Sequence, residues 1–127
     1  MNDEQYRQYG RDELADFGKK LSEQTNELPQ EDPLRELASA FCELGEANSA
    51  LYDVGPGLVS RLFTTYPEWA PTLPRHALWF LGGDCLHFMA DEEIALFQEL
   101  EEQRLAAAAE GKLFNIQEAR ANLLNLQ

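Results

Sequence analysis

The chain has 127 residues, 44% hydrophobic and 10% aromatic, which is the composition of one folded domain with a core of its own. Its 23 acidic residues outnumber 10 basic ones, and a net charge of −13 repels the phosphates of nucleic acids and of anionic membranes. No apolar run approaches the roughly 20 residues of a membrane span, and the acidic N-terminus lacks the pattern of a secretory signal. We therefore expect a cytoplasmic protein with reduced cysteines that contacts neither nucleic acid nor membrane.

A first helix is predicted over about residues 3–24, because apolar side chains recur there at helical spacing. Gly10 and Gly18 each lower its helix propensity by about 1 kcal/mol relative to alanine. We expect residues 1–31, which comprise this helix and a linker, to pack loosely or to be completed by a neighbour.

A second helix has a clear start, since Asp32 is a good N-cap and Pro33 suits the first helical position. Its apolar spacing continues to about residue 51, and Asn48 falls in the apolar seam. A seam asparagine can fix the register of paired helices; the alternative is an edge residue that bonds to a loop. Residues 52–57 suggest a turn before a short helix.

The segment 74–89 is the most informative, because it predicts one helix that is apolar around most of its circumference and therefore buried. A narrow polar stripe remains, formed by His76, Asp84 and His87. A buried stripe of this kind needs hydrogen bonds, a metal, a partner or a water-filled edge.

This stripe, with Trp79 and Phe80 beside it, is the candidate ligand-binding site. Asp84 and His87 share one side of the predicted helix, but His76 lies about 16 Å from His87 along it. Two ligands do not complete a metal site, so we expect no metal and no cofactor. The alternative interpretation is a structural polar network, or a stripe that lines a surface groove.

Two further helices follow, from about Asp91 to a stop at Gly111 and from Asn115 onward. Apolar residues of the first of these cover a wide arc, which indicates two neighbours, and one of them could be a second subunit. The predicted interface residues are Asn48, Ile94, Phe97, Glu101 and Leu105.

Together these patterns predict a single all-α domain, an irregular bundle of five or six helices around the helix over 74–89. We find no nucleophile motif and no phosphate-binding loop. We therefore favour a non-enzymatic homodimer that acts by protein–protein contact, as an adaptor, inhibitor or chaperone-like protein, on a partner that could be basic. The alternative is a small-ligand or metal-binding helical protein, or an enzyme, that uses the polar stripe.

Overall fold

The computed structural model describes residues 1–46 and 50–125, and all regular structure in these ranges is helical. The elements are α1 (Asp3–Gln24), α2 (Pro33–Glu43), α3 (Leu51–Thr65), the 3₁₀ helix η1 (Ala70–Thr72), α4 (Arg75–Leu81), the 3₁₀ helix η2 (Gly83–Phe88), α5 (Asp91–Ala109) and α6 (Ile116–Asn125). The all-α fold class is confirmed. None of the helices in these ranges is both long and apolar enough to cross a membrane.

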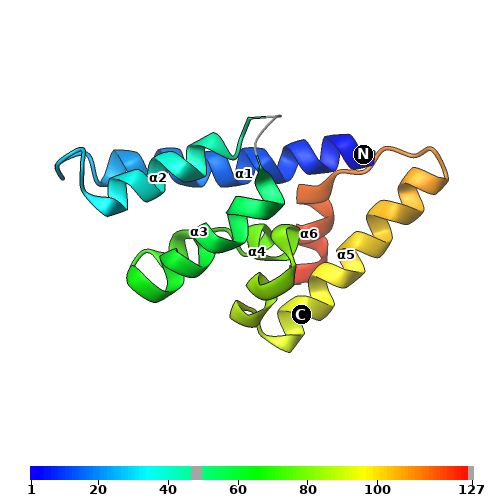
Figure 1. Ribbon diagram of the computed structural model, residues 1–127. Coiled ribbons are helices and arrows are strands. Elements are labelled where there is room, and N and C mark those ends of the chain that lie inside the picture. The colour runs from blue at the N-terminus through cyan, green and yellow to red at the C-terminus, as the bar shows by residue number, and fades with distance from the viewer. Residues whose placement is uncertain (47–49, 126–127) are drawn as a thin grey trace.

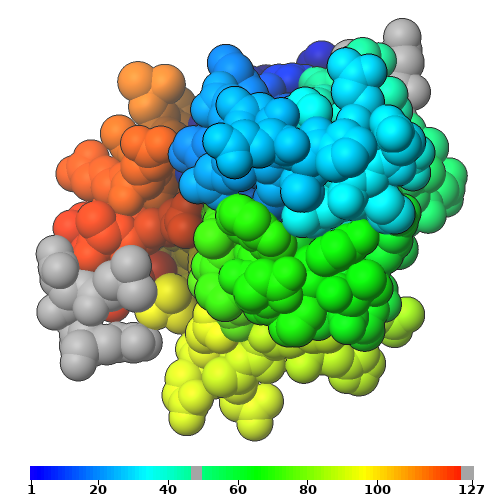
Figure 2. All heavy atoms as spheres, turned by 90° about the vertical axis from the view of Figure 1, so that its left-hand side faces the viewer, coloured from blue at the N-terminus to red at the C-terminus, as the bar shows by residue number. Residues whose placement is uncertain are grey.

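The helices form two groups around a shared core (Figure 1). α1 and α2 run side by side as an antiparallel hairpin, and the remaining elements lie below it, with α4 in contact with α1, α3 and α5. The space-filling view shows the end of α3 and the segment after it (green) directly against this hairpin (blue to cyan), with α6 (orange to red) at the side (Figure 2). The core side chains with no exposed surface are Leu14, Leu37, Ala38, Phe41, Val59, Leu62, Ala77 and Leu78.

The first helix is completed by a neighbour and does not pack loosely. An added Cβ at Gly18 would lie only 2.6 Å from the backbone nitrogen of Cys42 and 2.7 Å from the carbonyl oxygen of Ala38. An added Cβ at Gly10 would collide with the ring of Phe80. The two glycines that weaken α1 as an isolated helix thus permit its close packing, so the tertiary contacts offset the propensity cost.

The predicted boundaries between the second and third helices are wrong. α2 ends at Glu43 rather than near residue 51, and the expected turn over 52–57 lies within α3, which begins at Leu51 and contains Pro56. Proline removes one backbone hydrogen bond from a helix interior, but Gly55 beside it is buried against Leu81. We attribute the continuity of the helix to this tertiary packing. Asn48 lies outside the described residues.

The single central helix predicted over 74–89 is also wrong. α4 ends at Leu81, and Gly82 and Gly83 follow with φ angles of 66° and 53°. These left-handed conformations cost little only for glycine, so the Gly-Gly pair ends the helix and η2 starts in a new direction. The 3.6-residue period that defined the polar stripe stops at this point.

One arginine connects the helices on either side of this break. Arg75 donates two hydrogen bonds to Glu93, at 2.8 and 2.7 Å, and a third to the carbonyl oxygen of Phe88 at 2.7 Å. Glu93 also accepts a hydrogen bond from the backbone N–H of Ala90, which is the N-cap of α5. The guanidinium therefore fastens α4, η2 and α5 together. The predicted stop near Gly111 is confirmed.

Candidate functional site

The polar stripe expected on the central segment does not form one site. His76 is fully buried, whereas Asp84 and His87 are exposed on η2. Phe80 is buried and Trp79 half-buried, with the Trp79 ring stacked on Phe97 at 6.4 Å between centroids. No group of three or more candidate metal-ligating side chains occurs within residues 1–46 and 50–125. The helix break separates the stripe, and the interpretation as an internal polar network fits His76 alone.

Both ring nitrogens of His76 have partners on α1. Nδ1 lies 2.5 Å from Oε1 of Glu13, and Nε2 lies 3.0 Å from the hydroxyl of Tyr6. Burial, followed by the charge of Glu101, raises the pKa of the Tyr6 hydroxyl, which therefore stays protonated. In the neutral imidazole, Tyr6 donates to Nε2 and Nδ1–H donates to Glu13. This buried polar group is thus satisfied without a ligand.

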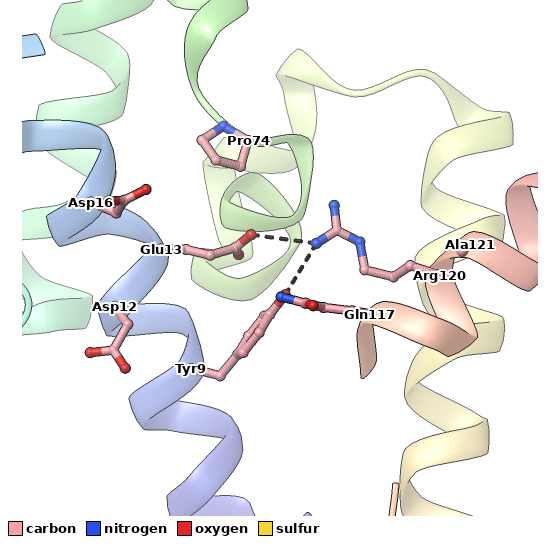
Figure 3. A pocket seen from close by; sticks show the side chains of 8 residues that line it. All are labelled: Tyr9, Asp12, Glu13, Asp16, Pro74, Gln117, Arg120 and Ala121. Atoms are coloured by element: carbon pink, nitrogen blue, oxygen red, sulfur yellow. Dashed lines mark hydrogen bonds and ion pairs between the residues drawn. The ribbon is translucent and has the colours of Figure 1, made fainter. Parts of the chain in front are cut away.

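The second oxygen of Glu13 faces α6. Oε2 lies 3.4 Å from Nη1 of Arg120, and the same nitrogen donates to the hydroxyl of Tyr9 at 3.3 Å. Figure 3 shows Glu13 and Arg120 pointing toward one another from α1 and α6. The Glu13 side chain is only 15% exposed and that of Arg120 is 25% exposed. Glu13 thus links the buried imidazole to a partly buried guanidinium.

A cleft of about 740 Å³ opens beside this pair, between α1, α6 and the start of α4. It is lined by Tyr9, Asp12, Glu13, Asp16, Pro74, Gln117, Arg120 and Ala121. The four α1 residues have the spacing i, i+3, i+4 and i+7, which places them on one helix face. Three carboxylates therefore face the cleft, against one guanidinium. A smaller hollow of about 80 Å³ adjoins it and shares Asp16 and Pro74.

The two outer carboxylates of the cleft are each held by one neighbour on α1, the half-buried Gln8 or the exposed Lys20. Asp12 accepts a hydrogen bond of 2.8 Å from Gln8, and Asp16 pairs with Lys20 at 3.0 Å. Exposed side-chain pairs one helical turn apart contribute a few tenths of a kcal/mol to the stability of the folded protein. Asp12 and Asp16 can therefore exchange these partners for an external cation at little cost.

The sequence model of one protein family matches residues 5–127, which is nearly the whole chain. The chain belongs to the PA2817-like family. No curated protein and no solved structure matches it. Membership in the PA2817-like family therefore supplies no site residues, and the site rests on the geometry alone.

In this PA2817-like chain, the face of α5 predicted as a dimer interface is largely used within the monomer. Phe97 is 4% exposed and lies against His76 and Trp79, and Ile94 is half-buried. Glu101 accepts two hydrogen bonds from Arg104. Only Leu105 stays open, with half of its surface exposed. The rest of the apolar arc faces two neighbours in the same chain, α4 and α6.

Sequence reasoning missed the residues that build the cleft. Tyr9 belongs to the apolar spacing that predicts the first helix, and the acids of α1 have the pattern of a solvated face. The spacing of Tyr9, Asp12, Glu13 and Asp16 was a signal in principle, but many exposed helices share it. The partner residue Arg120 is 107 positions from Glu13, and no local pattern connects them.

Proposed function

We propose that this protein is a small cytoplasmic binding domain, without enzymatic activity, that takes a basic segment of a partner protein into the cleft between α1 and α6. The observation that carries the proposal is the cleft itself, in which Asp12, Glu13 and Asp16 face an open volume of about 740 Å³. That volume lies within the usual range of binding sites. The net charge of −13 also favours a positively charged partner.

The chemistry of the lining suits a cationic side chain with an apolar stem. The ring of Tyr9 and the carbons of Pro74 and Ala121 provide apolar surface, on which the methylene groups of lysine or arginine can pack. Asp12 and Asp16 then provide negative charge at the solvent-exposed edge of the cleft. Charges in such positions mainly accelerate association and select against acidic partners.

The proposal is tested with a fluorescein-labelled peptide of alternating arginine and glycine, whose binding is followed by fluorescence anisotropy. The double variant Asp12→Asn/Asp16→Asn should weaken binding about fivefold or more at low salt, because two attractive charges are lost. Added salt should weaken binding to the natural chain.

The matched control is Glu23→Gln/Glu68→Gln, which removes the same charge from two exposed positions outside the cleft. We expect this variant to bind the peptide almost as the natural chain does. Equal losses in the two double variants would mean that net charge alone attracts the peptide. Equal affinity for a glutamate-glycine peptide would also contradict the proposal.

A further inference from the structure

We infer that α6 is an internal competitor for the cleft, in which Arg120 occupies the place that an arginine of the partner takes. The inference rests on the proposed function. It adds the group that the cleft recognises, a guanidinium, and the way in which access to the cleft is controlled. Its basis is the contact of Arg120 with Glu13 and Tyr9, two residues of the cleft wall.

Arg120 is held more loosely than the other arginines that bridge elements. Its hydrogen bonds measure 3.4 Å to Glu13 and 3.3 Å to Tyr9, beyond the usual 2.7–3.2 Å, and its guanidinium carbon lies 5.7 Å from the centre of the Phe97 ring. Arg75 binds both oxygens of Glu93, at 2.7 and 2.8 Å. The long contacts of Arg120 are those of an occupant that can be displaced.

The helix that carries Arg120 is also lightly anchored. Ile116 is the only fully buried residue within 116–123, while Ala119 and Leu123 are only partly buried where they pack against the core, and α5 is the principal neighbour of α6. Residues 110–113, which precede α6, are exposed, and the side chain of Leu113 is fully so. Segments with few buried contacts open at low free energy. Displacement of Arg120 therefore loosens α6 and leaves the core of the other helices in place.

The remaining acceptors favour arginine over lysine. Oε1 of Glu13 is engaged by His76, so Oε2 and the hydroxyl of Tyr9 are the two acceptors that Arg120 contacts. Arg120 reaches both of them through one nitrogen. An arginine that enters from a partner can use separate N–H groups of its planar fork, whereas a lysine ammonium offers one compact charge.

The test compares Arg120→Gln with the natural chain in the anisotropy experiment with the arginine-glycine peptide. Removal of the internal guanidinium should tighten binding about fivefold, the order of a partly exposed ion pair. The affinity for a lysine-glycine peptide should increase less in the same variant. The control is Arg61→Gln, which removes the same charge from an exposed position on α3 and should change binding less than twofold.

Unchanged or weaker binding by Arg120→Gln overturns the inference, and so does an equal gain in Arg61→Gln. If the Asp12→Asn/Asp16→Asn variant still loses affinity in that case, the proposed function stands without the competitor. If neither the natural chain nor Arg120→Gln binds the peptide, both fail. Should Arg120→Gln not fold, Arg120→Lys replaces it, with an expected gain of about twofold for the arginine peptide.

Hydrogen exchange of the natural chain provides a second readout. Saturating arginine-glycine peptide should speed amide exchange in α6 while slowing it in α1, because the peptide takes the contact with Glu13 from α6. Slower exchange in both helices would mean that the peptide binds on top of an undisturbed Arg120, and this result would overturn the inference.

Discussion

His76 and Glu13 are 63 residues apart in the chain, and their side chains meet in a hydrogen bond of 2.5 Å between Nδ1 and Oε1. The imidazole has no exposed surface, while the carboxylate reaches the wall of the cleft. This bond ties the orientation of a cleft residue to the packing of α4 in the core. Glu13 is therefore fixed in place, unlike its neighbours Asp12 and Asp16.

Replacement of this imidazole should be among the costliest single changes in the protein. We expect His76→Ala to lower the free energy of unfolding by about 3 kcal/mol, because it leaves a cavity and two partners, Tyr6 and Glu13, without their hydrogen bonds. Urea denaturation measures the change. His87→Ala is the control, since His87 is the chain's other histidine and is exposed, and it should cost less than about 0.5 kcal/mol. Similar costs for the two variants would contradict the buried network.

The close approach of α1 and α2 gives a second prediction. Gly18→Ala should destabilise the protein by about 2 kcal/mol, because the new methyl group meets backbone atoms of Cys42 and Ala38 that cannot move independently. Gly57→Ala is the matched change within α3, where an added Cβ meets nothing within 4 Å. It should stabilise the protein by about 0.5–1 kcal/mol through helix propensity. Thermal unfolding of both variants checks the opposite signs.

The Arg75–Glu93 pair predicts part of the response to acid. The hydrogen bond from Arg75 lowers the pKa of the Glu93 carboxyl below its ordinary value, although partial burial opposes this. A lowered folded-state pKa gives stability that is present above the ordinary pKa of glutamate and is lost as pH falls through the lowered value. Since the two side chains are 39% and 31% exposed, we expect only about 0.5–1 kcal/mol.

Glu93→Gln should therefore lower the free energy of unfolding by about 0.5–1 kcal/mol at pH 7 and by almost nothing at pH 3. Urea unfolding at both pH values measures the change. The neighbouring Glu92→Gln, at an exposed position, serves as the control and should have little effect at either pH. A cost of Glu93→Gln that is as large at pH 3 as at pH 7 would show that the ion pair is not its source.

Homodimerisation stays a prediction. If the outer face of α5 forms the interface, Leu105→Asp should shift the protein from dimer to monomer, because it places a charge in an apolar contact. Native mass spectrometry at micromolar concentration reports the subunit number. Leu113→Asp is the control, since Leu113 is fully exposed outside any helix. A monomer mass for the natural chain would refute the prediction.

The predictions that succeeded concern features decided within a few residues. Asp32 accepts a hydrogen bond from the backbone N–H of Leu34, with Pro33 at the first helical position. Asn115 accepts from the N–H of Glu118 at 3.0 Å, as its spacing indicates. Such capping contacts depend on local geometry, and the sequence therefore determined the helical class and several helix ends by itself.

Only the tertiary structure decided the continuity of the helices and the composition of the cleft. Pro56 lies inside α3 although its neighbourhood suggests a turn, because Gly55 beside it packs against Leu81. Glu13 joins His76 and Arg120 across 63 and 107 positions. The physical reason is that packing and hydrogen bonds between distant segments outweigh local preferences of about 1 kcal/mol.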